Sequence, residues 1–251
     1  MPVRVRVPPP APSVPVLTGF FIAARIISKI LLMKYQKALQ KIEQKLSQQK
    51  PKKLTIPHLV PAAVVIPFFE KDNKAHILFT LRTETVEHHK GQVSFPGGAK
   101  ESQDSTLSDT AVREFNEEVG IPRSMITIIG KLDDFPTVTN FLVTPYVATI
   151  PYPYPSNINK KEVDDVLEIP LSLFLSKNNF EEKKWEHKGK KYPVYFYYHN
   201  TNVIWGATAF IFNRFIEQVF DFNPASKSVE RDPRFDNYLR ENRDRKGKRE
   251  N

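Results

Sequence analysis

Residues 97–120, GGAKESQDSTLSDTAVREFNEEVG, constrain this chain more than any other stretch. Glu114, Glu117 and Glu118 follow one another at i, i+3 and i+4, so on a helix three carboxylates leave one face within a single turn. Taken alone, such acids also suit a solvated helix face. Like charges this close repel one another, however, and carboxylate oxygens are preferred ligands of hard cations. The cluster therefore indicates a divalent cation, most simply Mg²⁺ with phosphate as a co-ligand.

Composition limits the kinds of protein this can be. The chain has 251 residues, of which 40% are hydrophobic, enough for one mid-sized domain with its own core and additional segments at the ends. It contains no cysteine, which excludes disulfide frameworks, thiolate metal sites and cysteine nucleophiles. Any metal site must therefore use oxygen or imidazole ligands.

The positive charge lies at the two ends of the chain. The net charge of +9 divides into +10 for residues 1–53, −4 for residues 54–222 and +3 for residues 223–251. A nucleic-acid-binding domain normally carries a broad basic surface, and the central region is mildly acidic. We therefore expect a small-molecule substrate and no nucleic-acid partner.

Residues 1–53 form a basic N-terminal extension. Residues 17–33 read as an apolar helix that carries Arg25 and Lys29, and no acid precedes Glu43. This pattern is typical of a mitochondrial transit peptide, and we expect a mitochondrial location. The alternatives are membrane association through residues 14–33 and a solvated extension of a cytoplasmic protein.

The C-terminal residues 223–251 form a charged tail that we expect to be disordered. The tail is basic near its end, which is most often a feature of a solvated terminus. It ends in Arg249-Glu250-Asn251, which is not a peroxisomal signal.

The central region, residues 54–222, alternates between strand and helix patterns. A helical pattern at residues 34–49 precedes it. Within the region we expect one helix capped by Asp104 or Ser105 and ended by Gly120, and a last helix over residues 207–222. Pro145 places its strand at a sheet edge or at a bulge. The expected strands cover residues 62–69, 75–81, 125–132, 143–150, 162–169, 180–185 and 192–198.

The acidic helix resembles the Nudix box, whose usual form is G-x5-E-x7-R-E-U-x-E-E-x-G-U with U aliphatic. Here Gly98 is followed after five residues by Asp104, and after eight more by REFNEEVGI, which starts at Arg113. Three departures are visible: an aspartate at the first acidic position, one extra residue before Arg113, and Phe115 at an aliphatic position.

The upstream residues are similar to the branch of this family that hydrolyses coenzyme A. That branch has T-L-R followed by H-K-G-x-[IV]-S-F-P-G-G, and this chain has Thr80-Leu81-Arg82 and, over residues 89–98, HKGQVSFPGG. EVDDV at residues 162–166 and IWGATA at residues 204–209 extend the resemblance, which covers residues 58–221. Glu87 departs from it, because the branch usually has an arginine there that is a candidate for holding the 3′-phosphate.

The resemblance implies an α/β fold, a Nudix-type α/β/α sandwich with a mixed β-sheet. It also implies hydrolysis of the pyrophosphate of coenzyme A or acyl-CoA, with Mg²⁺ or Mn²⁺, to 3′,5′-ADP and 4′-phosphopantetheine or its acyl form. The alternatives are hydrolysis of another nucleoside diphosphate derivative, such as ADP-ribose or NADH, and a catalytically weak CoA-binding adaptor.

Roles for individual residues follow from the same resemblance. Glu114 and Glu118 would hold the principal cation, Glu117 would be a second ligand or orient water, and Glu101 would be a further ligand. Arg113 would position these carboxylates through charge-assisted pairs. The residues assigned to substrate binding are Arg82, His89, Lys90, Gly97 and Gly98.

Three further features have a structural and a functional interpretation. The pair His88-His89 lacks a third ligand at suitable spacing, so we interpret it as a loop element. Trp205 is expected to anchor the core, with base stacking as the alternative. The third feature is an acidic segment with Glu162, Asp164 and Asp165. We expect it to be a solvated strand edge, with a catalytic base as the alternative.

Overall fold

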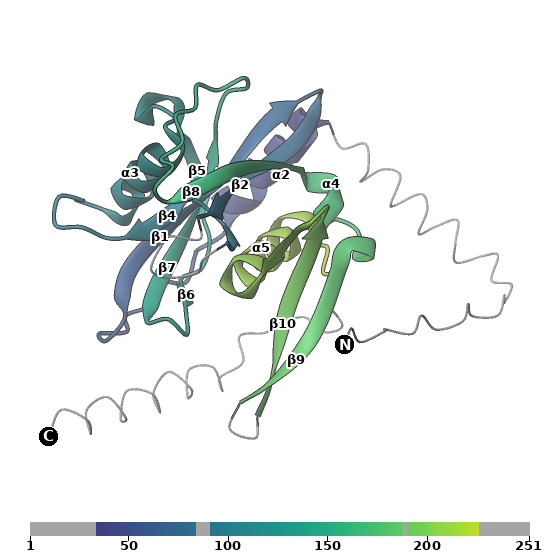
Figure 1. The fold of residues 1–251 in the computed structure, drawn as a ribbon. Coiled ribbons are helices and arrows are strands. Elements are labelled where there is room, and N and C mark those ends of the chain that lie inside the picture. The colour runs from purple at the N-terminus through teal and green to yellow at the C-terminus, as the bar shows by residue number, and fades with distance from the viewer. Residues whose placement is uncertain (1–33, 84–90, 188–189, 226–251) are drawn as a thin grey trace, which may run out of the picture.

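The computed structural model describes residues 34–83, 91–187 and 190–225 (Figure 1). Four helices lie in these ranges: α2 (Tyr35–Gln48), α3 (Leu107–Val119), α4 (Leu171–Phe174) and α5 (Gly206–Phe220). The strands are β1 (Val60–Lys71), β2 (Lys74–Arg82), β3 (Val93–Ser94), β4 (Gly97–Ala99), β5 (Thr127–Lys131), β6 (Phe135–Pro136), β7 (Phe141–Thr149), β8 (Val163–Pro170), β9 (Phe180–His187), β10 (Lys190–His199) and β11 (Asn202–Trp205).

The main sheet is mixed. Its strands run in the order β3-β2-β1-β7-β5, with β4, β6 and β8 paired to β1, β7 and β2 respectively. β1 and β7 are parallel, whereas β1 and β2 form the antiparallel hairpin expected from the sequence. β9, β10 and β11 form a separate three-stranded sheet, and the hairpin of β9 and β10 extends away from the main body (Figure 1).

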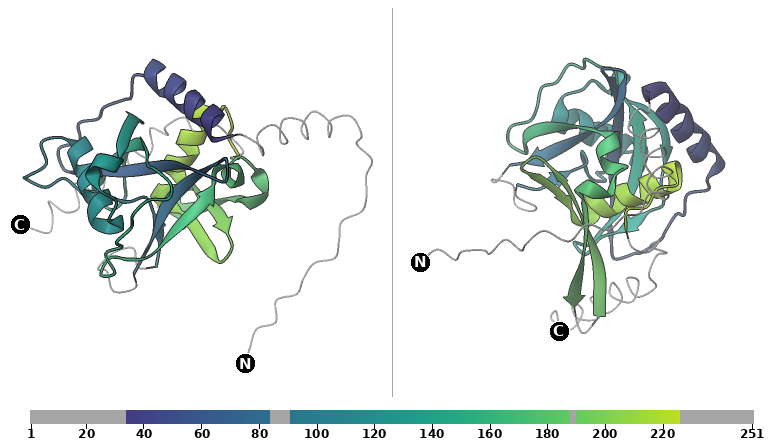
Figure 2. Two further views of the ribbon diagram at one scale, coloured as in Figure 1. Left: turned by 90° about the horizontal axis from the view of Figure 1, so that it is seen from above. Right: turned by 90° about the vertical axis from the view of Figure 1, so that its right-hand side faces the viewer.

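Helices cover both faces of the main sheet (Figure 2). β1 alternates between the two sides, because Ile66 and Phe68 belong to the cluster that contains α2 and α5, whereas Val65 and Phe69 belong to the cluster that contains α3. A strand buried on both faces reads as a continuous apolar run, which explains the sequence AAVVIPFF. The expected α/β/α sandwich with a mixed sheet is confirmed.

Helix α2 is part of the packed core, although the sequence placed it in the N-terminal extension. Ala38 and Ile42 on its inner face are fully buried, and Tyr35 stacks on Phe68 with ring centroids 5.1 Å apart. On its outer side, Lys41 and Lys45 contact Asp221 at the end of α5. The folded unit therefore extends towards the N-terminus beyond residue 54 and includes α2.

Of the two expectations for Pro145, the edge strand is wrong, because β7 lies inside the sheet between β1 and β5, whereas the pairing of β5 with β7 is irregular, as at a bulge, between Ile128 and Gly130. Proline lacks an N–H group and is normally excluded from positions inside a sheet. Pro145 is tolerated because it lies between the part of β7 that pairs with β5 and the part that pairs with β6. Its carbonyl still accepts a hydrogen bond from the N–H of Leu132, at 2.9 Å.

Trp205 does not anchor the core. Its relative exposure is 43%, and its ring lies parallel to that of Phe196, its partner across β10 and β11, at 6.2 Å. Ile204 and Tyr197, which point to the other face of this small sheet, are fully buried instead. The alternation of β11 therefore directs Trp205 outward.

No helix within the described ranges is long and apolar enough to cross a membrane. The apolar helix expected at residues 17–33 and the tail from residue 226 lie outside these ranges.

Candidate active site

Helix α3 carries the acidic cluster, and its ends are fixed by local sequence. Thr106 is the N-cap, and it forms a capping box with Asp109 in which each side chain accepts a hydrogen bond from the other residue's backbone N–H. Gly120 ends the helix in the left-handed conformation, at φ 81°. The expected cap at Asp104 or Ser105 is wrong, because the carboxylate of Asp104 has another partner.

Asp104 binds Arg113 with both carboxylate oxygens. The Nε of Arg113 lies 2.9 Å from Oδ1 and its Nη2 lies 2.9 Å from Oδ2. Both side chains are buried, and the hydroxyl of Thr110 and the backbone N–H of Glu101 also donate to Oδ2. The hydrogen bonds from Arg113 hold the pKa of Asp104 well below its ordinary value. The shorter side chain and the extra residue before Arg113 therefore still allow a two-point pair.

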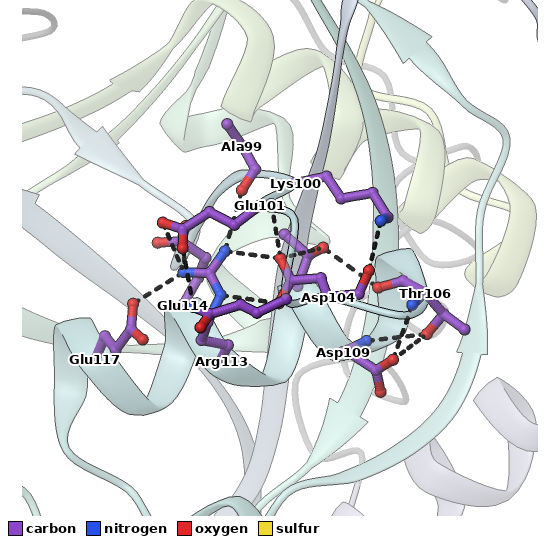
Figure 3. Close-up of polar contacts among 11 residues, drawn as sticks. Ala99, Lys100, Glu101, Asp104, Thr106, Asp109, Arg113, Glu114 and Glu117 are labelled. Carbon is purple, nitrogen blue, oxygen red and sulfur yellow. Dashed lines mark hydrogen bonds and ion pairs between the residues drawn. The ribbon is translucent and has the colours of Figure 1, made fainter.

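The other side of the Arg113 guanidinium faces the glutamates (Figure 3). Its Nη1 donates to Glu114 at 3.0 Å and to Glu117 at 2.9 Å, and lies 3.7 Å from Glu101. Its Nη2 also donates to the backbone carbonyl of Ala99 in β4, at 3.1 Å. With a relative exposure of only 2%, Arg113 fixes the carboxylates of Glu114 and Glu117 relative to β4.

Glu118 has the most unusual environment of the three glutamates. Its relative exposure is 1%, its Oε1 lies 3.5 Å from Nη1 of Arg82, and its Oε2 is buried without a hydrogen-bond partner. Burial raises the pKa of Glu118 to about 8, against the opposing effects of Arg82 and of a hydrogen bond from the Gly97 backbone. A buried carboxylate with one oxygen unpaired is costly for the fold, and such cost is typical of functional sites.

Gly98 lies against Glu114 and Gly97 lies against β1, and neither position has room for a larger residue. A Cβ atom on Gly98 would lie 2.4 Å from Oε1 of Glu114. A Cβ atom on Gly97 would lie 2.3 Å from the carbonyl oxygen of Ala63 in β1. Burial also raises the pKa of Glu114, despite its contact with Arg113. Gly98 therefore lets β4 approach the Glu114 carboxylate closely.

Glu162, the residue before β8, lies nearer the site than the sequence suggested. The N–H of Asn159 donates to the Glu118 carbonyl at 3.0 Å, and its side chain lies 3.4 Å from Oε1 of Glu162. The charge of Glu162 contributes to the raised pKa values of Glu114 and Glu118. Asp164 and Asp165 are exposed, as expected of a solvated edge.

A cavity of about 360 Å³ adjoins the Arg82 side of the site. It is lined by Leu81, Arg82, Thr83, Gly91 and Asp164. Arg82 also contacts Glu118, so it lies between the cavity and the acidic face of α3. The expected substrate residues His89 and Lys90, together with Glu87 and His88, lie outside the described residues.

The residues at the site fit a divalent cation held by few protein ligands. Among the described residues, no three His, Asp or Glu side chains converge closely enough to form a complete metal cage. Glu114 and Glu118 nevertheless lie one turn apart, and Glu118 has a free oxygen. Mg²⁺ is commonly held by one or two carboxylates and completed by water and substrate phosphates, which matches this arrangement.

Two roles were not expected from the sequence. Asp104 binds Arg113, where a helix cap was expected, and Glu162 lies close to the site, where a solvated strand edge was expected. The first was recognisable from the motif, in which an acid at this position precedes the arginine. The second depends on how residues 157–162 fold back over the end of α3, where Asn157 donates to the carbonyl of Val119. That contact joins residues far apart in the chain and leaves no local signal.

The chain is similar to known proteins of one family. Residues 58–188 match the model of the NUDIX domain. A relative from Photorhabdus laumondii, "Uncharacterized Nudix hydrolase NudL", is 37% identical over 63% of this chain and 84% of its own length. A protein of the same name from Yersinia pestis is 36% identical over 63% of this chain and 79% of its own length.

Solved structures of similar proteins include the NUDIX domain of Shewanella oneidensis NrtR complexed with ADP ribose, with a TM-score of 0.38 at 19% identity, covering 53% of this chain and 84% of that one. A MutT/nudix family protein from Enterococcus faecalis has a TM-score of 0.41 at 14% identity, covering 79% and 73%. From the domain match and these relatives, the chain belongs to the Nudix family and is a hydrolase of phosphoric anhydrides in nucleoside diphosphate derivatives.

Proposed function

We propose that this Nudix hydrolase cleaves the pyrophosphate of coenzyme A or acyl-CoA, giving 3′,5′-ADP and 4′-phosphopantetheine or its acyl form. One observation carries the proposal. The two motifs that resemble the CoA-hydrolysing branch, residues 80–82 and 89–98, meet at the acidic helix. Arg82 of the first lies 3.5 Å from Glu118, and Gly98 of the second lies against Glu114. Segments that meet at the candidate reaction centre are suited to recognising one substrate.

Nudix hydrolases generally use a divalent metal such as Mg²⁺ or Mn²⁺. In this chain Glu114 and Glu118 would hold the principal ion, with Glu117 and Glu101 as further ligands or as groups that orient water. When bound, the cation would neutralise phosphate charge and lower the pKa of the attacking water.

The surrounding residues hold this arrangement in place. Arg113, fixed by Asp104, keeps Glu114 and Glu117 on one side of the helix. Gly98 lets β4 approach the Glu114 carboxylate and Gly97 lets it approach β1. The backbone of β4 would then lie close to the substrate phosphates. Arg82 at the cavity, with His89 and Lys90, would bind the phosphate groups of the substrate.

A second substrate class is supported by one feature of the cavity. Asp164 lines the cavity, and Arg82 is the only cationic residue among the described residues that line it. A carboxylate accepts hydrogen bonds from sugar hydroxyls but repels phosphate. With Glu87 in place of an arginine, this favours a nucleotide without a 3′-phosphate, such as ADP-ribose or NADH. A catalytically weak CoA-binding adaptor is the third alternative.

The test is product identification with the full chain. CoA, ADP-ribose and NADH are incubated separately with Mg²⁺, and products are identified by mass spectrometry. We expect 3′,5′-ADP and 4′-phosphopantetheine from CoA, and no products from the Glu118→Gln variant. Turnover of ADP-ribose in preference to CoA would support the second class, and turnover of none by the wild type would support the adaptor.

We also propose that residues 1–53 direct the protein to mitochondria, with membrane attachment through residues 14–33 as the alternative. Imaging a fusion of residues 1–53 to a fluorescent reporter tests this, and a diffuse cytosolic signal would contradict both.

A further inference from the structure

Arg82 lies between two parts of the site that are otherwise separate. On one side its Nη1 faces Oε1 of the buried Glu118, and on the other it lines the cavity together with Leu81 and Asp164. It is the last residue of β2, and its backbone is fixed by pairing with Val163 of β8. A change of partner therefore requires only a rotation of its side chain.

The contact of Arg82 with Glu118 leaves both groups incompletely satisfied. The distance of 3.5 Å is well beyond the roughly 2.7–2.9 Å of a strong charge-assisted hydrogen bond. The Nε of Arg82 and the Oε2 of Glu118 are both buried without a partner. A guanidinium has five N–H donors and a carboxylate accepts about four hydrogen bonds, so the pair uses a small part of its capacity.

A cation bound at Glu118 cannot leave this contact unchanged. A divalent ion and a guanidinium on the same buried carboxylate repel one another strongly, because the surroundings screen charge poorly. Arg82 then needs another anion, and the cavity that it already lines is where the substrate phosphates would lie. Among the described residues that line the cavity, Asp164 is the only other charged one, and it is exposed, so solvent weakens its repulsion of phosphate.

We propose that Arg82 is a positioning residue that exchanges partners: it contacts the Glu118 side chain in the metal-free protein and turns to a substrate phosphate when a divalent cation binds Glu118. This inference rests on the proposed function and extends it: cation and phosphate strengthen one another's binding partly through Arg82. Such coupling is reciprocal, so it is measurable from either ligand.

The test measures binding and needs no turnover. The dissociation constant of 3′,5′-ADP is measured by calorimetry with and without saturating Mg²⁺, for the wild type, Arg82→Gln and Arg82→Lys, and AMP is titrated in parallel. We expect Mg²⁺ to strengthen the binding of 3′,5′-ADP to the wild type. Arg82→Gln should reduce this strengthening about ten-fold or more, because it removes one hydrogen bond to a charged group. Arg82→Lys should restore part of it. Arg123→Gln, which removes an exposed cation from the 3₁₀ turn after α3, is the matched control and should change nothing.

The outcomes separate this inference from the substrate assignment. Coupling with AMP but not with 3′,5′-ADP keeps the role of Arg82 and refutes the CoA assignment. The same strengthening by Mg²⁺ in Arg82→Gln as in the wild type refutes the exchange, whatever the substrate. A crystal structure with Mn²⁺ and nucleotide in which Arg82 still contacts Glu118 would refute it as well.

Discussion

Replacing Glu118 with glutamine should make the metal-free protein more stable while it abolishes activity. The carboxyl of Glu118 is almost completely buried, and burial raises its pKa from an ordinary 4.5 to about 8. Between these two pH values the unfolded chain has released a proton that the folded protein still holds. Stability therefore falls as the pH rises through this window, and a glutamine, which does not ionise, avoids that loss.

The size of the effect follows from the width of the window. At about 1.4 kcal/mol for each pH unit, ionisation of Glu118 costs the fold about 1 kcal/mol at pH 5.5, about 3 kcal/mol at pH 7 and about 5 kcal/mol above pH 8. The free energy of unfolding of Glu118→Gln should exceed that of the wild type by an amount that grows in this order. Arg82, which loses its partner in the variant, still reaches solvent and adds a smaller cost.

The assay is urea unfolding in EDTA at pH 5.5, 7.0 and 8.5. The matched control is Glu117→Gln, whose side chain is 50% exposed and which should not be more stable than the wild type. Adding Mg²⁺ should then stabilise the wild type and not Glu118→Gln, by mass action. A variant no more stable than the wild type at pH 8.5, or a difference independent of pH, would refute the account of Glu118 as a buried carboxylate kept for function.

Three further predictions concern the residues around the site. Asp104→Asn leaves the buried Arg113 without its two-point partner and should lower the free energy of unfolding by about 3 kcal/mol in urea denaturation, whereas Asp109→Asn at the capping box should cost about 1 kcal/mol. Gly98→Ala would place a methyl group against Glu114 and should lower kcat/KM at least about ten-fold, with little change in the melting temperature. Its control is Gly130→Ala, whose methyl group would meet Leu46 of α2: this variant should lower the melting temperature and leave kcat/KM unchanged. Ile42→Ala should cost about 3 kcal/mol if α2 belongs to the folded unit, against less than about 0.5 kcal/mol for the exposed Gln44→Ala, and equal stabilities would contradict that packing.

The catalytic helix was predictable because its signals are local. The apolar spacing of Ala111, Phe115 and Val119 sets its buried face, and Gly120 ends it. The same spacing predicts that three carboxylates share a turn. It does not predict that Glu118 alone is buried, because that depends on Arg82 and on β4, which come from other parts of the chain.

The errors arose where tertiary contacts decide between local alternatives. Pro145 indicates an edge strand, yet its strand is interior, and the proline is tolerated because the neighbouring strand changes from β5 to β6 there. Trp205 is large and apolar, yet alternation along β11 turns it outward and buries Ile204. Proline and charge mark residues 50–53 as a boundary, yet the helix before them packs on the sheet through Tyr35. Propensity and composition give no information on which face of an element finds a partner.

The central claim is that the acidic face of α3 holds a divalent cation that supports hydrolysis of the CoA diphosphate. Following the ³¹P signals of CoA with the full chain tests it most directly. With Mg²⁺ and wild-type protein, the diphosphate signals should be replaced by signals of phosphomonoesters, and the rate should fall at least about 100-fold with EDTA or in Glu118→Gln. Diphosphate signals that persist with the wild type, or that disappear equally fast in Glu118→Gln, would contradict it.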